Sequence, residues 1–440
     1  MRLLPLIGAT YFMVAGGPYG LEDIIGKAGY GRALLLLLLI PLVWSLPTSL
    51  MVGEMASAMP NEGGYYTWVR RALGDFWGFQ EAWLSLSASV FDMAIYPVTF
   101  VLYLSRLAPA WTSGNRSTLW ALAVVLGCIV WNLRGAKAVG SGSLWLFAVM
   151  LTPFAALIGF GIWLGLIQHV AGGGWGALTQ PSAAPDMAGA ISVCLWNYMG
   201  WDNASTVAQE VESPQRTYPR AMLISAALVA LTYILPLAAV ALAGVPAGQF
   251  STGAWVDAAR HVAGGKAWGA GLALAVVIGG TISGIGMFNA LMMSYTRIPF
   301  ALAEDGFLPA LFKRRTRNGV PWISVLACGI AWGLAVRLSF ERLISIDLVL
   351  YGAALLLEFL ALLVFRIRQP EMPRPFRIPG GLTGAVAAGI GPAVLIVFAM
   401  WAARAETIAG MPALLFAALL AACGPLLYAL AKLLRRQPSL

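Results

Sequence analysis

The stretch Ala15-Gly16-Gly17-Pro18-Tyr19-Gly20 interrupts the first apolar segment of the chain, Leu3–Gly26. Proline removes a backbone donor and clashes with the preceding helical turn, and several glycines lower helix stability further. Unwound backbone at membrane depth is tolerated only where it is buried in protein or lines a cavity. The stretch therefore predicts a helix break within the first span; a Gly/Pro kink that only serves packing is the alternative.

The sixth apolar segment has a comparable interruption, Trp196-Asn197-Tyr198-Met199-Gly200-Trp201-Asp202-Asn203. It holds one glycine but many polar and aromatic side chains, so its break is inferred less directly. Two breaks five spans apart are typical of inverted-repeat transporters, whose half-helix ends meet at the midplane. Free amides at such ends attract an anion, and free carbonyls attract a cation or ammonium. We therefore expect the substrate between the two breaks.

The composition requires a lipid environment. The 440 residues are 60% hydrophobic and 11% charged, with a mean hydropathy of +0.79, whereas soluble domains are nearer half apolar and a quarter charged. Apolar stretches of about 20 residues recur and predict an all-α membrane protein with roughly twelve spans in one domain. In chain order the predicted spans are Leu3–Gly26, Ala33–Met59, Trp77–Leu104, Thr118–Leu133, Ser143–Ile167, Met187–Val211, Pro219–Gly244, Trp268–Phe300, Pro321–Leu338, Leu343–Phe365, Thr383–Ala402 and Met411–Leu434.

The basic residues indicate the orientation. With both ends inside, roughly 19 of the 28 Lys and Arg lie in inner segments and roughly 9 in outer ones. The net charge of +9 is therefore a topology signal, and no nucleic-acid partner is expected. We expect a multi-pass protein of the cytoplasmic membrane with cytoplasmic termini. The apolar start imitates a signal peptide, but its continuation into Pro18-Tyr19-Gly20 and Glu22-Asp23 favours a first span.

Two aspartates inside spans are the leading chemical candidates, because a charge at membrane depth is costly and is usually paired or functional. Asp202 follows the second break, where it is a candidate for binding a substrate amine or a proton; capping a second half-helix at Ala204–Val211 is the alternative. Asp92 lies one helical turn before Tyr96 in the third span. It is a candidate for gating or proton transfer, and a structural hydrogen bond is equally open.

Three glutamates also fall within predicted spans: Glu54, Glu81 and Glu358. For Glu54 and Glu81, near the cytoplasmic ends, solvated or ion-paired roles are expected. Glu358 is an ionisable residue of the tenth span without an assigned role.

Aromatic and hydroxyl side chains complete the candidate site. Tyr19, Trp196, Tyr198 and Trp201 are positioned to form a wall for an ammonium group or an apolar chain, although packing explains any one of them equally well. Ser283 lies in a run of small residues, which favours close helix packing, with a hydroxyl lining an ion site as the alternative. Four dispersed cysteines and two histidines give no basis for a disulfide, metal site or cofactor.

An ordered set of short motifs runs along the chain. The motifs are Gly16-Gly17-Pro18-Tyr19-Gly20 with Glu22-Asp23, Pro41-Leu42-Val43-Trp44-Ser45-Leu46-Pro47, Pro60-Asn61-Glu62-Gly63-Gly64-Tyr65, Trp77-Gly78-Phe79-Gln80-Glu81, Asp92-Met93-Ala94-Ile95-Tyr96-Pro97, Trp201-Asp202, Glu210-Val211-Glu212, Pro219-Arg220-Ala221 and Pro373-Arg374-Pro375-Phe376-Arg377-Ile378-Pro379. With them the chain resembles the amino acid–polyamine–organocation superfamily over essentially its whole length. The likeness is strongest to plant and protozoan polyamine uptake transporters, relatives of the L-type amino acid transporters.

The resemblance implies a leucine-transporter-like fold with two five-span inverted repeats, 1–167 and 187–366, and two extra spans within 381–434. It implies alternating access with the substrate between spans 1, 3, 6 and 8, the part of span 10 being open. The candidate substrate-binding residues are Met13, Gly16, Gly17, Pro18, Tyr19, Asp92, Tyr96, Asn197, Tyr198, Gly200, Trp201, Asp202 and Ser283. The candidates for coupling or gating are Glu22, Asp92, Asp202 and Glu210.

Two departures from that group bear on the substrate and the coupling ion. Its polyamine carriers typically have a Glu three residues before the Gly-Gly-Pro, where this chain has Met13. An acidic partner for a distal ammonium is therefore missing, which favours an amino acid or a smaller amine. Some bacterial relatives use a Lys in span 5 for proton coupling, but Ser143–Ile167 contains no Lys or Arg.

The sequence thus predicts a secondary carrier of amino acids or related small amines, working by proton symport or exchange. A polyamine–proton symporter for putrescine or spermidine is the alternative on the same fold. The expected partners are the small substrate, a proton or sodium ion, and the bilayer. An intramembrane enzyme would need a converging nucleophile–base or metal set, and no such motif occurs, so no enzyme is expected. A sensor that does not transport stays open, although no signalling domain is attached.

Overall fold

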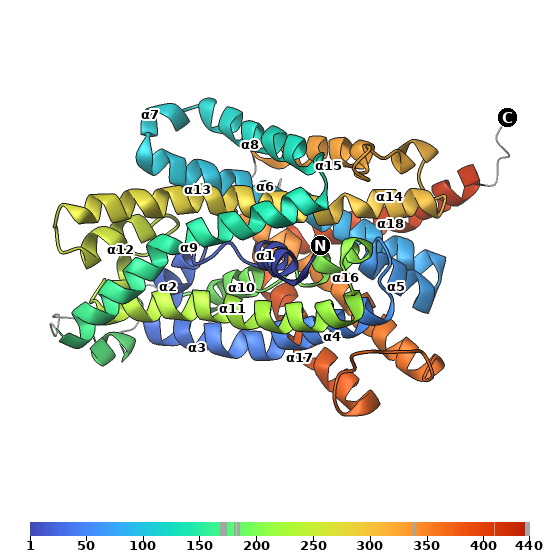
Figure 1. Cartoon of the computed structure of the whole chain (residues 1–440), viewed down its shortest axis with the longest axis horizontal. Coiled ribbons are helices and arrows are strands. Elements are labelled where there is room, and N and C mark those ends of the chain that lie inside the picture. Colours follow the sequence, from blue (N-terminus) through green and yellow to red (C-terminus); the bar gives the residue numbers. More distant parts are fainter. Residues whose placement is uncertain (168–173, 180–181, 183–184, 338–339, 409, 436–440) are drawn as a thin grey trace.

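The computed structural model describes residues 1–167, 174–179, 182, 185–337, 340–408 and 410–435. Its helices run mostly along the long axis of the molecule (Figure 1). Within the described residues, eight helical runs are long and apolar enough to cross a membrane: Tyr30–Ala58, Asp75–Leu107, Ala136–Ile167, Pro214–Leu242, Trp268–Glu304, Ile344–Arg368, Gly381–Ala403 and Ala413–Arg435. Together with shorter apolar helices and two broken spans, they give the predicted order of spans.

The first half of the chain begins with the broken span α1 (Leu3–Val14) and α2 (Glu22–Ala28). The second span is α3 (Tyr30–Ile40), the π-helical turn η1 (Pro41–Ser45) and α4 (Leu46–Ala58). Proline at the start of η1 lacks a backbone donor, which explains the local π-turn. The helices that follow are α5 (Gly64–Leu73), α6 (Asp75–Leu107), α7 (Pro109–Thr112), α8 (Arg116–Asn132), α9 (Ala136–Ile167) and η2 (Gly174–Thr179).

The second half repeats the plan. Its broken span is α10 (Met187–Asn197) followed by the 3-10 turns η3 (Asp202–Thr206) and η4 (Ala208–Glu210). The remaining elements are α11 (Pro214–Leu242), η5 (Ala247–Gln249), α12 (Trp255–Val262), α13 (Trp268–Tyr295), α14 (Arg297–Glu304), η6 (Ala310–Lys313), α15 (Trp322–Ala335), α16 (Phe340–Arg368), α17 (Gly381–Ala403), the antiparallel pair β1 (Thr407–Ile408) and β2 (Met411–Pro412), and α18 (Ala413–Arg435).

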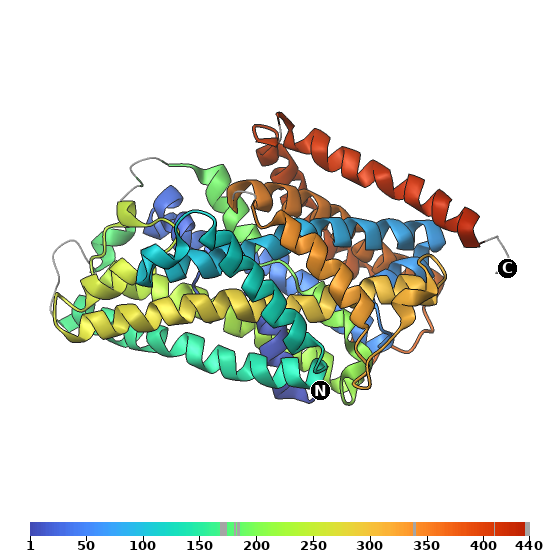
Figure 2. The ribbon, with the colours of Figure 1, turned by 90° about the horizontal axis from the view of Figure 1, so that it is seen from above.

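The predicted spans are confirmed with small shifts at their ends. Leu338, the predicted end of the ninth span, lies outside the described residues. The sixth span differs in one respect: beyond its break the chain forms 3-10 turns rather than a second α-helical half. The last two spans lie at the periphery, and Figure 2 shows α18 along one edge of the bundle. Only 17% of its most apolar stretch is buried inside the protein.

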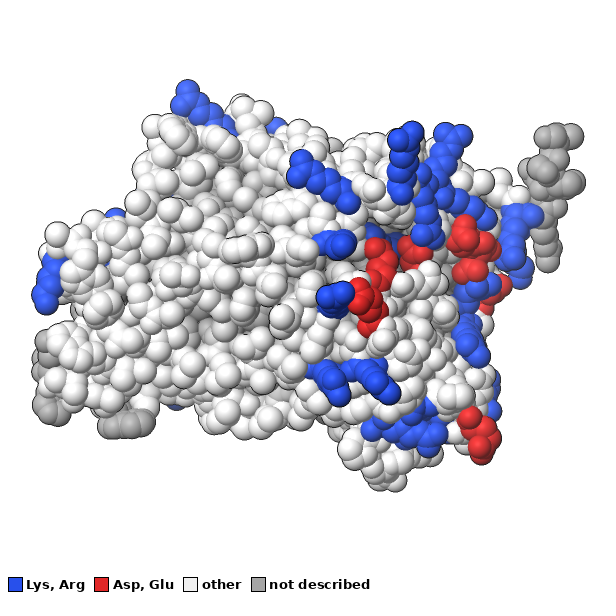
Figure 3. All heavy atoms as spheres, viewed as in Figure 1, with Lys and Arg blue, Asp and Glu red and all other residues white. Residues whose placement is uncertain are grey.

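Charged side chains gather at one end of the molecule. On the face shown in Figure 3 the Lys, Arg, Asp and Glu side chains concentrate toward the end that holds the C-terminus, and most of the rest of that face is uncharged. At this end the α5–α6 hairpin is tied to the residue after α14 by Arg70–Asp305 (2.5 Å), and the loop before α5 is held by Arg315–Glu62 (2.8 Å). A wide uncharged band with charges at one end is the surface expected of a membrane-embedded bundle.

Candidate functional site

The first break makes room for close contact with α13. Between α1 and α2 the backbone is not helical, and Gly17 (φ 71°) and Gly20 (φ 93°) adopt positive φ values, which glycine tolerates without penalty. A Cβ atom on Gly16 would lie 2.3 Å from the Ser283 hydroxyl oxygen, so only glycine fits without a shift. Ser283 donates a hydrogen bond to the Gly16 carbonyl at 2.7 Å.

The second break touches the first one. Gly200 has φ 93°, and a Cβ there would lie 2.3 Å from the Met13 carbonyl oxygen at the end of α1. The Gly200 amide donates to the Tyr351 hydroxyl of α16 at 3.0 Å, and that hydroxyl donates to the Asp202 carboxylate. Both unwound segments therefore pack against one another, and α16 is joined to the second.

Backbone amides near the amino-terminal end of α2 donate hydrogen bonds to a carboxylate of the protein itself. Glu22 accepts hydrogen bonds from the Gly20 amide (2.7 Å), the Gly253 amide (3.1 Å) and the Tyr103 hydroxyl. Its side chain is fully buried. An anionic group thus already occupies the position where free amides would attract a substrate carboxylate.

The space between the breaks is small. Asp92 accepts hydrogen bonds from Tyr96 (2.5 Å) and from the Trp196 indole (3.3 Å), and the two rings stack with centroids 6.2 Å apart. Tyr96 and Trp196, with Tyr19 and Ser283, line a cavity of about 10 Å³. This is room for about one water molecule, so the site is closed around very little free space.

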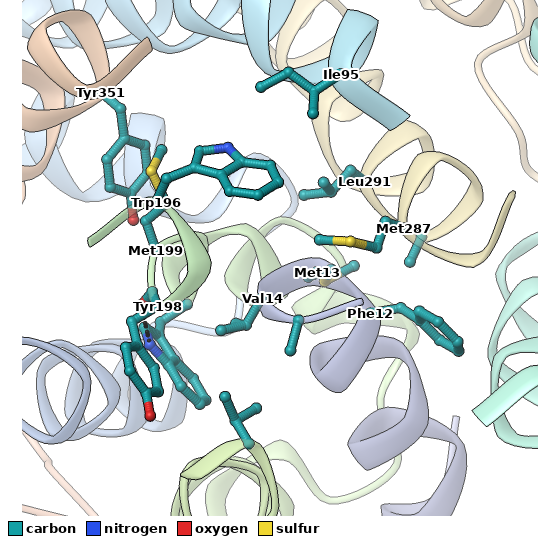
Figure 4. Packing of buried hydrophobic residues seen from close by; sticks show 14 of the residues in the cluster. Phe12, Met13, Val14, Ile95, Trp196, Tyr198, Met199, Met287, Leu291 and Tyr351 are labelled. Atoms are coloured by element: carbon teal, nitrogen blue, oxygen red, sulfur yellow. Dashed lines mark hydrogen bonds between the residues drawn. The ribbon is translucent and has the colours of Figure 1, made fainter. Parts of the chain in front are cut away.

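Several predicted residues frame the breaks without lining this cavity. Asn197 donates to the Gly20 carbonyl at 3.3 Å and joins the two broken spans. Tyr198 donates to the Leu37 carbonyl of α3 at 2.8 Å, and Trp201 donates to the Tyr198 carbonyl at 2.8 Å. Figure 4 shows Trp196 and Tyr198 pointing in opposite directions from the sixth span. The structure therefore brings Trp196 to the cavity and leaves Tyr198 and Trp201 in the packing behind it.

Asp202 belongs to a line of buried carboxylates that we call the acidic ladder: Glu81, Asp92, Asp202, Asp347 and Glu358. Each is at most 3% exposed. None forms an ion pair with a Lys, Arg or His within the described part of the chain. Asp347 was not identified from the sequence as a candidate site residue, although its spacing from Glu358 gave a signal. It precedes Glu358 by eleven positions, the spacing that also separates Glu81 from Asp92.

The side-chain oxygens of the ladder are poorly satisfied. Neither oxygen of Asp347 or of Glu358 has a hydrogen-bond partner among the described residues, and the same holds for Glu81 Oε2. Ser85 donates to the other Glu81 oxygen at 2.8 Å. Among the described residues Glu81 is thus neither exposed nor ion-paired, which corrects the sequence-based expectation. Its burial is consistent with the packing of α5 and α16 against α6.

Glu54 and Glu210 have quite different surroundings. Glu54 pairs with Arg366 (2.5 Å) and Arg374 (3.4 Å) and accepts the Ile378 amide at 2.8 Å, so its expected ion-paired role is confirmed. Glu210 pairs with the buried Arg297 at 2.7 Å. Both clusters join segments far apart in sequence near the charged end of the molecule.

The opposite end holds a cavity of about 660 Å³ between α2, α10, α16 and α17. Lys27 and Asp186 form an ion pair of 2.8 Å on its wall. The Lys27 ammonium and the Gly189 amide hold the pKa of the Asp186 carboxyl below its usual value, because both stabilise the charged form. Ile344 and Leu348, which flank Asp347 on α16, line the same cavity.

Comparison with known proteins places this geometry in a family. The sequence profile described as amino acid permease matches residues 7–421. The chain belongs to the amino acid permease family. Among the relatives of this permease are polyamine transporter PUT1 of Oryza sativa subsp. japonica (33% identity over 401 residues, 90% of this chain and 72% of the relative) and polyamine transporter RMV1 of Arabidopsis thaliana (31% over 403 residues, 90% and 79%). The serine/threonine exchanger SteT of Bacillus subtilis is 25% identical over 386 residues, 85% of this chain and 83% of SteT.

A solved structure supports the fold independently. The crystal structure of MhsT in complex with L-phenylalanine superimposes with a TM-score of 0.65 at 14% identity, covering 91% of the permease and 98% of MhsT. The predicted superfamily and the leucine-transporter-like fold with broken spans 1 and 6 are confirmed. The permease is therefore a multi-pass membrane transporter that works by alternating access, and it is not an enzyme.

Proposed function

We propose that the permease takes up small organic amines across the cytoplasmic membrane in a proton-coupled cycle, with short diamines as the leading substrates. The carrying observation is the pair Asp92 and Asp202, buried at the two sides of the second break without a basic partner in the described chain. A buried carboxylate needs a proton or a cation nearby. An ammonium group between the breaks would supply one.

Glu22 supports an amine over a zwitterionic amino acid. A bound amino acid must place its carboxylate against free donors, and the Gly20 and Gly253 amides near α2 already donate to Glu22. A second carboxylate there would compete for the same donors and face repulsion from the first. An amine without a carboxylate avoids both costs.

The names of the relatives point both ways. PUT1 and RMV1 are named polyamine transporters, and SteT is named a serine/threonine exchanger. Met13 favours the shorter amines, because the acidic partner expected for a distal ammonium is absent. Amino acid exchange is accordingly the second candidate function.

The site and the topology form part of the proposal. Tyr19, Tyr96 and Ser283 would contact the substrate, with Gly16, Gly17, Pro18 and Gly200 giving close backbone approach. Asn197 would hold the two breaks together, Met13 would lie beside the substrate, and Tyr198 and Trp201 would support the breaks from behind. Glu22 and Glu210 would act in gating. The repeats are proposed at 1–167 and 187–366, followed by the extra spans within 381–434.

Orientation follows from charge. The end with the C-terminus carries a concentration of charged side chains in Figure 3, and inner loops are enriched in Lys and Arg in membrane proteins. We place this end and both termini in the cytoplasm. The cavity of about 660 Å³ then faces outward, and the Glu54 and Glu210 ion pairs close the inner side. This arrangement fits an outward-facing stage of alternating access.

The test is uptake of radiolabelled putrescine into proteoliposomes that contain the purified permease. Asp202→Asn should lower uptake by about 10- to 100-fold, because a charged contact worth about 1.5–3 kcal/mol is lost. Glu371→Gln, an exposed position, serves as the control. Unchanged kinetics in Asp202→Asn would remove Asp202 from the site. If serine uptake saturates while putrescine is neither transported nor competes with it, the amine proposal fails in favour of amino acid exchange.

A further inference from the structure

Four of the five carboxylates of the acidic ladder lie on two helices, α6 and α16. On α6, Glu81, Ser85, Asp92 and Tyr96 fall on one face within about 60° of each other. On α16, Asp347, Tyr351 and Glu358 fall on one face within about 40°. Each helix therefore holds two carboxylates eleven positions apart, or roughly 16 Å along its axis.

The acidic faces of α6 and α16 meet, and the two helices run antiparallel. The helices α6 and α16 pack against each other, with Asp347 within electrostatic range of Asp92 and Glu358 within electrostatic range of Glu81, so the carboxylates face one another at two levels. Asp202 interacts with all four of them. The ladder therefore has an outer rung of Asp92 and Asp347, an inner rung of Glu81 and Glu358, and Asp202 between them.

A third element supplies an independent unpartnered group. Tyr65 of α5 is fully buried, and its hydroxyl has no hydrogen-bond partner among the described residues. It interacts electrostatically with Glu81, Asp202 and Glu358, so it lies at the inner rung. The titratable groups that face the ladder from all packed elements are Glu81, Asp92 and Tyr96 on α6, Tyr65 on α5, Asp202 on η3, Tyr295 on α13, and Asp347, Tyr351 and Glu358 on α16.

Asp347 of the outer rung lies next to residues that line the outer cavity, and the inner rung lies toward the cytoplasmic end. Ile344 and Leu348, which lie beside Asp347, line the cavity of about 660 Å³ that we assign to the outer side. Glu81 lies two turns into α6, close to the charged end of the bundle. Glu81 and Glu358 of the inner rung are almost fully buried, which leaves little room beside them for an ammonium group with its carbon chain. A proton needs no such room.

From this arrangement we infer that the acidic ladder is the proton path of the permease, which takes up a proton at Asp347 and Asp92 and releases it inward at Glu358 and Glu81. Asp202, between the rungs, is where the proton and the substrate meet. Carboxylate chains at membrane depth are a recurring form of proton relay. The inference rests on the proposed function for the identity of the coupled substrate and for the orientation of the two ends.

The experiment compares two transport modes in proteoliposomes for wild type, Glu358→Gln and Tyr65→Phe, with Glu371→Gln as the control. An inside-alkaline pH gradient should drive putrescine accumulation in wild type and in the control. In Glu358→Gln this accumulation should fall at least tenfold, while counterflow exchange of putrescine, which needs no net proton movement, is retained. In Tyr65→Phe, which keeps the ring and so protects folding, gradient-driven uptake should fall severalfold, again with exchange retained.

Other outcomes overturn the inference. Undiminished gradient-driven accumulation in Glu358→Gln would exclude the inner rung from the path. A variant that stays coupled but loses affinity for spermidine more than for a monoamine would show that the ladder holds ammonium groups instead. A substrate-free measurement covers the case in which no amine is transported. Infrared difference spectra between acid and alkaline pH should show a protonated-carboxyl band in wild type that is weakened in Glu358→Gln, and an unchanged band would contradict the inference.

Discussion

Buried carboxylates occur in two regions of the permease with opposite surroundings. At the inner end, Glu54 is held by Arg366, Arg374 and the Ile378 amide, so its charge is fully compensated. In the acidic ladder, five carboxylates share no basic partner within the described chain, and two of them have no hydrogen bond. The first arrangement fixes segments in place. The second keeps positions open for a mobile positive charge, since an uncompensated buried charge is costly.

The largest difference between the two regions is expected when Glu54 is replaced. Glu54→Gln leaves two arginines of low exposure without their carboxylate, and it should lower stability by about 3–5 kcal/mol. Glu358→Gln removes a group with no partner and should change stability by less than about 1 kcal/mol. Thermal unfolding of both purified variants in detergent measures the difference. Equal losses in the two variants would mean that the regions are energetically alike.

A glycine-to-alanine substitution should have different effects in the unwound breaks and in regular helix. Gly200→Ala forces a Cβ toward the Met13 carbonyl at a residue with φ 93°, so it should cost about 1–3 kcal/mol and lower uptake. Gly127→Ala is the matched control, because nothing lies within 4 Å of its Cβ position in α8. That substitution should be neutral or stabilising by up to about 1 kcal/mol. Comparable unfolding temperatures for the two variants would contradict the assigned role of Gly200.

A carboxylate added beside the first break tests which amines the site prefers. Met13→Glu should lower the Kd for putrescine about tenfold, or about 1.4 kcal/mol, by restoring an acidic partner for a second ammonium. Met13→Gln has a similar shape without the charge and should leave the Kd unchanged. Ligand-induced thermal shifts measure both. No difference between these variants would defeat the view that Met13 limits polycation binding.

The smallest effect is expected at the outer cavity. Asp186→Asn removes a partly exposed ion pair with Lys27, which is worth less than about 1 kcal/mol. Because the pKa of Asp186 is lowered in the folded state, its contribution is present above about pH 4 and is lost as the pH falls through the folded value. Unfolding midpoints of wild type and variant should therefore differ slightly at pH 7 and converge in acid. A gap that widens in acid would contradict the sign.

Much of the fold could be predicted because membrane spans depend on local composition. Runs of apolar residues define the spans, and Gly16-Gly17-Pro18 predicts the first break through backbone chemistry alone. The break around Gly200 was less certain because a single glycine permits several conformations. The 3-10 turns after it could not be predicted, since they depend on contacts such as that between Tyr351 and Asp202, which lie far apart in sequence.

Hydropathy and local backbone preference are enough to predict a chain that lies in a membrane, crosses it about twelve times and breaks two of those spans. The partners of each buried charge depend instead on how the helices pack. Glu54 and Glu81 look alike in the sequence, yet packing gives one of them two arginines and the other a neighbouring carboxylate. The environment of a buried charge is set by the helices packed around it, and that packing made Asp347 and Glu358 part of the same line as Asp202.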